Sequence, residues 1–195
     1  MKKIFALLAL SAAATSAMAA GPTVGISYDG DYGSETKVFV AQATAIGSFD
    51  AGLLATRYNK YGSFVDTSKY GKDNANGFDV GYTTPAYDVY GPIGLTGRVG
   101  YGRLNNIDQN GGGFVGNTSY FSVGTEASTP ITDSLNGFIN YRHRNPFSTG
   151  PIQNRAQIGV DYAVDKNISA RLGVSYARQA DHSGVGAATS LEYTF

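Results

Sequence analysis

The feature that most constrains this chain is an alternation of apolar and polar residues that recurs along most of its length. Between residues 168 and 176 every second residue is apolar, while Ser169, Arg171 and Ser175 stand at positions between them. Successive side chains of a β-strand point to opposite faces, so a period of two indicates a strand with one apolar and one polar face. The pattern therefore favours an all-β fold.

Ten segments follow this pattern after the first twenty residues. They cover residues 23–29, 35–45, 49–58, 76–85, 93–103, 117–127, 135–144, 154–163, 168–177 and 187–195. Most have the length that lets a tilted strand cross a bilayer, and short connections alternate with longer ones. These features predict a transmembrane antiparallel up-and-down β-barrel with both ends on one side, which requires an even number of strands. Ten strands fit best, and eight are the alternative because 23–29 is short.

The first residues have the composition of a secretory signal peptide. Lys2 and Lys3 precede an apolar run, and the small residues that follow end in Ala17-Met18-Ala19. The run is too short to be a spanning helix, which needs about 20 residues. A basic head, a short apolar middle and an A-x-A end predict cleavage after Ala19. Residues 1–19 are thus expected to be removed, and 20–195 to form one barrel domain in the outer membrane.

Composition excludes several other classes of protein. The chain has no Cys, so it has neither disulfides nor a Cys-based zinc site. Removing Lys2 and Lys3 from 15 basic residues leaves 13 against 15 acidic ones, a balance that predicts no nucleic-acid partner. No later stretch is apolar for long enough to form a membrane helix, so a membrane crossing requires a closed barrel. No metal site and no cofactor are predicted.

Aromatic residues on the apolar face sort to the two ends of the expected strands. Those toward the longer loops are Tyr28, Phe78, Tyr101, Phe121, Tyr141 and Tyr176. Those toward the short turns are Phe49, Tyr82, Tyr162, Tyr193 and Phe195. Two aromatic rings separated by aliphatic residues are typical of girdles at the two lipid interfaces. A soluble barrel would bury its apolar face and has no reason to sort aromatic residues in this way.

The signal peptide, the alternating strands and the closing Leu191, Tyr193 and Phe195 together resemble the small outer-membrane β-barrel proteins of Gram-negative bacteria. In that family a terminal Phe, with apolar residues two and four positions earlier, is recognised by the barrel-assembly machinery. The resemblance implies that outer-membrane lipid and lipopolysaccharide, this machinery and periplasmic chaperones are partners, and that the protein is a monomer. Such barrels include pores, adhesins, enzymes and structural anchors, so the resemblance does not choose a function.

The polar face is expected to place charged side chains inside the barrel. The predicted lumen charge cluster is Asp79, Arg98, Glu126, Arg142, Arg155, Asp161, Arg171 and Glu192. Unpaired charges are costly in a narrow lumen, so we expect Arg171 to lie between Asp161 and Glu192, and Asp79 to pair with Arg98. Matched charges favour a structural plug over a constriction that sets selectivity. Arg142, Arg144 and Arg155 are less well matched, and would favour anions if a narrow pore exists.

The leading functional hypothesis is therefore a non-enzymatic integral outer-membrane protein, either with a structural or surface-interaction role or with a narrow polar pore. One alternative is an adhesin that binds through loops 59–75 and 104–116, of which the first contains tyrosines and lysines. A second is an outer-membrane hydrolase that uses His182 and Ser183 in the last long loop. Adjacent residues rarely form a catalytic triad, whose members converge from separate parts of a fold, so no catalytic residues are predicted.

Overall fold

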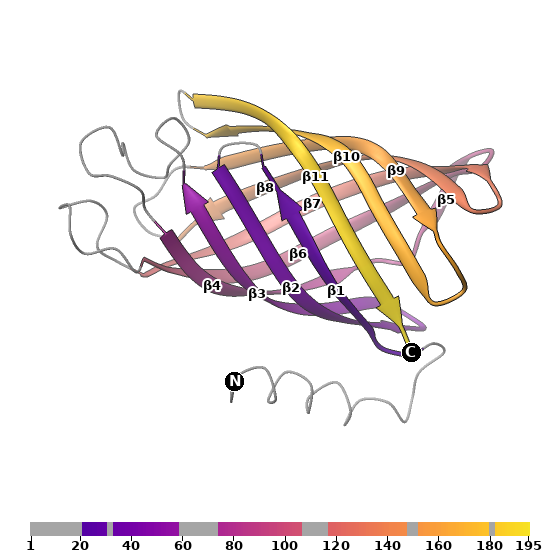
Figure 1. The fold of residues 1–195 in the computed structure, drawn as a ribbon, viewed down its shortest axis with the longest axis horizontal. Coiled ribbons are helices and arrows are strands. Elements are labelled where there is room, and N and C mark those ends of the chain that lie inside the picture. Colours follow the sequence, from indigo (N-terminus) through magenta and orange to yellow (C-terminus); the bar gives the residue numbers. More distant parts are fainter. Residues whose placement is uncertain (1–20, 31–32, 59–73, 107–116, 148–151, 180–181) are drawn as a thin grey trace.

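A computed structural model describes residues 21–30, 33–58, 74–106, 117–147, 152–179 and 182–195. These residues form an all-β, antiparallel structure (Figure 1). Its strands are β1 (Thr23–Asp29), β2 (Gly33–Thr44), β3 (Gly47–Tyr58), β4 (Asn74–Thr83), β5 (Tyr87–Tyr90), β6 (Ile93–Asn106), β7 (Asn117–Thr132), β8 (Leu135–Pro146), β9 (Gln153–Ala163), β10 (Ile168–Gln179) and β11 (His182–Thr194). Within the described ranges, no helix is long and apolar enough to span a bilayer.

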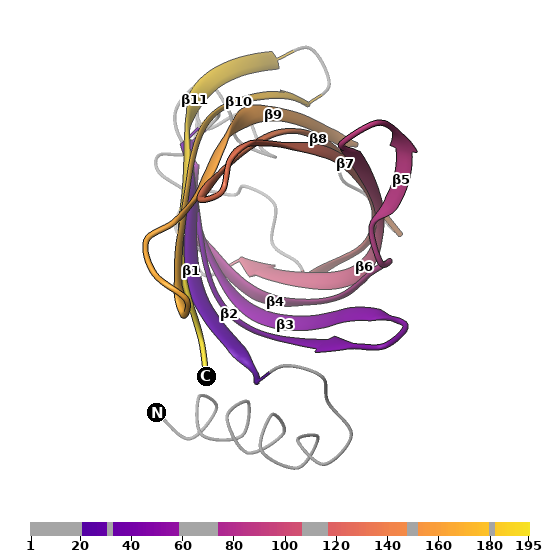
Figure 2. The ribbon, with the colours of Figure 1, turned by 90° about the vertical axis from the view of Figure 1, so that its right-hand side faces the viewer.

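Ten strands close into a barrel (Figure 2), and the short β5 continues β4 along the first residues of β6. Each barrel strand pairs with the next one in sequence. β4 pairs directly with β6, although β5 lies between them in sequence, and β1 pairs with β11. In the closing pair, Val24 is opposite Tyr193 and Ile26 is opposite Leu191. The predicted ten-stranded barrel is therefore confirmed, and the eight-stranded alternative is wrong.

The short strand β5 lies within the predicted connection between the fourth and fifth barrel strands. The β4–β6 ladder runs to Thr83, and the Thr84 N–H then donates to the Gly97 carbonyl at 2.8 Å. Pro85 follows, and because Pro has no N–H it interrupts the ladder. Pairing resumes one residue out of step, with Tyr87 opposite Leu95. β4 and β5 thus form one long strand with an irregularity at Pro85.

β11 begins at His182, five residues earlier than the alternation predicts. The first residues of the strand are small or polar, so their sequence carries no apolar period. They nevertheless continue the β10 ladder, with His182 opposite Gln179 and Gly186 opposite Ser175. Backbone pairing rather than side-chain pattern therefore extends this strand.

Tight turns and the two described ends of the chain gather at one end of the barrel, called here the short-turn end. Gly47 takes φ 139°, and the Thr44 hydroxyl donates to its carbonyl at 2.7 Å. In the β9–β10 turn, the Asp165 carboxylate accepts the backbone N–H groups of Asn167 and Ile168, at 2.6 and 2.9 Å. The opposite end is called the long-loop end, because the longer connections join the strands there.

The barrel is apolar outside and polar inside. Aliphatic side chains on the outer wall are about half exposed or more, among them Ile26, Val38, Val99, Ile139, Ile158, Leu172, Val174 and Leu191. Buried side chains inside include Asp79, Arg144, Arg155 and Ser175. This is the reverse of a water-soluble domain, and such an apolar wall is stable only against lipid. The chain is a transmembrane β-barrel.

Glycines on the inner face make room for large lumen side chains. The Tyr120 ring on β7 lies where a Cβ at Gly102 of β6 would be, and the Phe39 ring occupies the same position at Gly25. Because Gly has no side chain, an aromatic ring can lie flat across the neighbouring strand at these positions. Tyr120 is only 4% exposed, so its ring has little space into which to move.

We predict that Gly102→Ala destabilises the folded barrel by about 1–3 kcal/mol, because the new methyl group would overlap the Tyr120 ring. The matched control is Gly94→Ala on the same face of β6, where the new Cβ would have its nearest neighbour at 3.6 Å. Denaturant unfolding in detergent micelles, followed by tyrosine fluorescence because the chain has no Trp, measures both variants. Equal stability of the two variants would contradict this packing argument.

Candidate functional site

The candidate site is the barrel interior, where charged side chains from most strands meet. Toward the long-loop end, five of them form a group that we call the Glu35 cluster: Asp29, Glu35, Arg142, Arg144 and Arg155. The Glu35 carboxylate accepts from Arg144 Nη1 at 2.6 Å and Nη2 at 3.0 Å, and from Arg142 and Arg155 at 3.3 Å each. Arg155 also donates to Asp29 at 2.9 Å.

Glu35 bridges two walls of the barrel. It comes from β2, whereas its partners come from β8 and β9, which lie on another side of the ring (Figure 2). Arg144 and Arg155 are each only 3% exposed. These ion pairs therefore cross the lumen instead of following one wall.

Further side chains pack around Arg144. The Tyr120 ring lies against its guanidinium, with 4.9 Å between the guanidinium carbon and the ring centroid. Tyr120 in turn forms a buried apolar cluster with Leu54 and Leu104, and Gln153 accepts from Arg144 at 3.2 Å. The long-loop half of the described interior is therefore filled by side chains.

The three arginines of the Glu35 cluster are held unequally. Arg142 and Arg155 are directly opposite each other in the β8–β9 ladder, an arrangement of like charges that is destabilising. Arg142 contacts Glu35 at 3.3 Å, and its side chain is 24% exposed, against 4% for Arg144 and for Arg155. Arg142 is therefore the least buried arginine of the cluster.

A second group of charges lies farther toward the short-turn end. The Lys37 ammonium lies 2.8 Å from Asp50 and 2.7 Å from Asp79, and Arg98 donates to Asp50 at 2.9 Å. The expected pair between Asp79 and Arg98 is therefore not formed. The ladder places Arg98 opposite Thr83, four residues along β4 from Asp79, and Lys37 lies nearer to that carboxylate.

Arg171 forms the third group. It donates to Asp161 at 2.6 and 2.8 Å, and across the lumen to Glu126 at 2.8 and 3.1 Å. The structure thus brings Arg171 and Asp161 together, but Glu126 takes the place expected for Glu192. Register explains the difference, because the residue opposite Arg171 on β11 is Ser190, and Glu192 lies one inward position nearer the short-turn end.

A cavity of about 370 Å³ occupies the lumen between these groups. Arg142 and Arg155 lie at its long-loop side, whereas Ser48 and Thr83, near the turns, lie at its short-turn side. Further charged residues in its wall are Asp29, Lys37, Asp50, Arg98, Glu126, Arg171 and Glu192. The lumen therefore combines a filled half and a hollow half, and the hollow half is lined by charged and polar groups.

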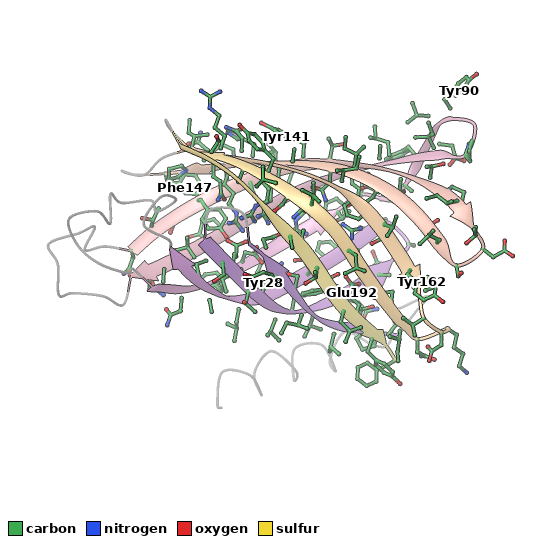
Figure 3. The ribbon with its side chains drawn as sticks, turned by 45° about the horizontal axis from the view of Figure 1, so that its top comes forward. Tyr28, Tyr90, Tyr141, Phe147, Tyr162 and Glu192 are labelled. Carbon is green, nitrogen blue, oxygen red and sulfur yellow. The ribbon has the colours of Figure 1, made fainter. Side chains whose placement is uncertain are left out.

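The structure places the predicted girdle residues on the outer wall. Ten of them are 37–66% exposed: Tyr28, Phe49, Phe78, Tyr101, Phe121, Tyr141, Tyr162, Tyr176, Tyr193 and Phe195. Tyr82 is half-buried, because its ring packs against Phe49 at 5.0 Å. Phe147 was not in the predicted set, yet it contacts Tyr101 and Phe121 at 6.0 and 5.8 Å. Figure 3 shows Tyr141 and Phe147 toward one end, and Tyr162 toward the other.

Within the described residues, the structure forms no site for either alternative hypothesis, the hydrolase or the adhesin. His182 and Ser183 lie in strand β11 and not in a loop, which corrects the expectation, and Asp181 lies outside the described residues. Of the proposed adhesin loops, 59–73 and 107–116 lie outside the described residues, and the remaining positions belong to β4 and β6. Among described residues, no group of three or more His, Cys, Asp or Glu could hold a metal ion.

The sequence analysis did not identify four interior charges: Asp29, Glu35, Lys37 and Asp50. On β2 the run Val38-Phe39-Val40-Ala41 is apolar on both faces, which hides the alternation that would have assigned Lys37 to the inside. Phe39 in fact faces the lumen, where it lies against Gly25. Glu35 and Lys37 are two positions apart, which puts them on the same face of a strand. This spacing was the signal that could have assigned both to the interior.

No protein-family model matches the chain, and no curated protein matches its sequence. Solved structures resemble it. The KdgM porin is 10% identical, with TM-score 0.44 over 89% of this chain and 99% of that chain. The translocator domain of the autotransporter NalP from Neisseria meningitidis is 11% identical, with TM-score 0.46 over 100% and 95%. Ail from Yersinia pestis is 15% identical, with TM-score 0.40 over 90% and 99%.

The geometry of the Glu35 cluster predicts unequal outcomes for two charge-removing substitutions. Glu35→Gln removes the carboxylate that Arg142, Arg144 and Arg155 share, and should destabilise the barrel by about 3–5 kcal/mol. Arg142→Gln removes one 3.3 Å contact together with the repulsion from Arg155, so it should cost much less stability. Denaturant unfolding in detergent micelles measures both. Similar losses of stability in the two variants would contradict this difference between their contacts.

Proposed function

We propose that this protein is a non-enzymatic integral outer-membrane β-barrel with a structural or surface-interaction role, whose lumen is closed to solutes. The observation that carries the proposal is the bridge from Glu35 on β2 to Arg144 and Arg155 on β8 and β9. A buried ion-paired bridge across a lumen resists opening, because separating it would leave uncompensated charges in a restricted space. Matched pairs around Asp50 and Arg171 support the same role for the rest of the interior.

A narrow polar pore is the second candidate function. The cavity favours it, because among the described residues the Glu35 cluster and its packing separate that space from the long-loop end. If the cluster opened, its arginines would favour the passage of anions. The two candidates differ in whether the closed state is permanent.

The residues of the outer wall indicate which components of the cell envelope the barrel contacts. Its exposed aliphatic belt suits membrane lipid, and the short-turn end is expected to face the periplasm. Arg103 and Arg178 are on the outer wall at the long-loop end, where lipopolysaccharide phosphates are expected to lie. We further propose a monomer that periplasmic chaperones deliver to the barrel-assembly machinery.

The closed lumen is tested by planar-bilayer conductance of the purified, folded protein. The wild type should show no steady current. Glu35→Ala should conduct, because without the bridging carboxylate the three arginines repel one another and the two walls lose their link. Asp88→Asn is the control, since this exposed carboxylate lies on β5 at the short-turn end, away from the Glu35 cluster. A steady wild-type current would overturn the closed-lumen proposal and support the pore.

The C-terminal residues Leu191, Tyr193 and Phe195 are proposed to act as the assembly signal. Phe195 is 66% exposed and contacts the Tyr193 ring at 5.0 Å, so the folded barrel depends little on it. Phe195→Ser should therefore reduce the folded fraction in cell envelopes, measured by heat-shifted electrophoresis, while refolding of purified protein in detergent is unchanged. Phe147→Ser is a control of similar exposure, 64%. An equal loss in both variants would mean that the terminal position has no special role.

A further inference from the structure

Four polar side chains lie side by side on the outer wall of β8–β11, at the long-loop end. His143 is opposite Asn154 in the β8–β9 ladder. Arg178 of β10 is opposite Asn154 on one side and Ser183 of β11 on the other. Residues directly opposite each other in antiparallel strands lie on the same face of the sheet. Because Arg178 and Ser183 are exposed and the other two are half-buried, we call these four residues the polar row.

The polar row lies at the edge of the apolar outer wall. Two positions nearer the short-turn end, Tyr141 on β8 and Tyr176 on β10 are 44% and 45% exposed. Two positions farther, Ile139 and Val174 are 56% and 53% exposed. The wall thus changes from aliphatic to aromatic to polar toward the long-loop end. An arginine on the lipid face is costly near the middle of a bilayer and little or not at all near its surfaces, so the polar row is at the level of the lipid headgroups.

Two side chains of β8 hold Asn154 in one orientation. Its side-chain carbonyl accepts from the Tyr141 hydroxyl at 2.5 Å and from His143 Nδ1 at 2.8 Å. Because this oxygen is turned toward β8, the amide nitrogen with its two N–H donors is turned the other way, toward Arg178 on β10. The Cβ atoms of directly opposite residues are about 5 Å apart, so the amide and the guanidinium group can donate to the same ligand.

We propose that the polar row binds a phosphate group of lipopolysaccharide, with Arg178 and Asn154 as the main contacts. This inference deepens the proposed role in the outer membrane and rests on it, since the long-loop end has to face the outer leaflet. Arg178 can donate a bidentate pair of hydrogen bonds to two phosphate oxygens, and Asn154 can donate an N–H beside them. The contact does not require an arginine without other partners, because a guanidinium group has five N–H donors.

The wall next to the polar row favours a phosphate that carries acyl chains. A free phosphate ion would contact only the exposed row, where water competes for the same donors. A lipid phosphate at this level adds contacts between its acyl chains and the aliphatic wall, which includes Ile139, Ile158 and Val174. Binding at a membrane surface increases with both apolar contact and charge attraction. Lipopolysaccharide carries phosphates beside several acyl chains, and it is the lipid expected at the long-loop end.

The experiment is isothermal titration calorimetry of the folded full-length barrel in detergent micelles, with empty micelles as the blank. The probes, all in the same detergent, are lipid A, which carries phosphates and acyl chains of lipopolysaccharide, phosphatidylglycerol, which is a different anionic lipid, and inorganic phosphate. We expect saturable binding of lipid A and weaker binding of the other two probes. Arg178→Gln should weaken lipid A binding about tenfold or more, through loss of a charge-assisted contact.

Two conservative substitutions and a matched control distinguish a specific contact from general attraction to charge. Arg178→Lys keeps the charge but loses the bidentate geometry, and Asn154→Asp keeps the shape but replaces N–H donors by a carboxylate. Both should weaken lipid A binding about tenfold. The control is Arg103→Gln, which removes an outer-wall arginine at the same end that lies between Phe78 and Ser119 instead of beside an amide. This variant should bind lipid A nearly as the wild type does.

Every variant is first shown to be folded by its heat shift in electrophoresis. The proposal is overturned if lipid A shows no saturable binding, or if phosphatidylglycerol or inorganic phosphate binds as tightly. It is also overturned if Arg103→Gln weakens lipid A binding as much as Arg178→Gln does. A steady wild-type current in the bilayer experiment would overturn the closed lumen and leave lipid A binding unaffected, so the two proposals fail separately.

Discussion

The pairing of β1 with β11 is the constraint on which the rest of the structure depends. In lipid each backbone N–H and C=O group needs a partner within the protein, so a sheet that crosses a membrane must have no free edge. Val24 opposite Tyr193 and Ile26 opposite Leu191 close that edge with apolar side chains outward. Closure turns each strand's second face inward, and a narrow lumen then forces the charged residues of distant strands into contact.

The two halves of the interior accommodate these charged residues in different ways. Toward the long loops, Glu35, Arg144 and Tyr120 are buried and fill the space between opposite walls. Toward the short turns, smaller residues such as Ser48, Thr83 and Ser190 leave a cavity among the ion pairs. Glycines of neighbouring strands decide where large rings can lie, as Gly102 does for Tyr120. One barrel thus combines a half that ion pairs cross with a hollow half lined by charged and polar groups.

The sequence predicted the barrel well, because a period of two and strand length are local properties. The interior was harder, since an ion pair across a lumen depends on register and on which strands face each other. Arg171 with Asp161 was predictable, because one hairpin sets their register. The pair of Glu35 and Arg144 joins two walls of the barrel and positions 109 apart in sequence, so no local pattern indicates it. Pro85 likewise indicates an interruption of the ladder after β4, but it does not indicate that the short strand β5 follows.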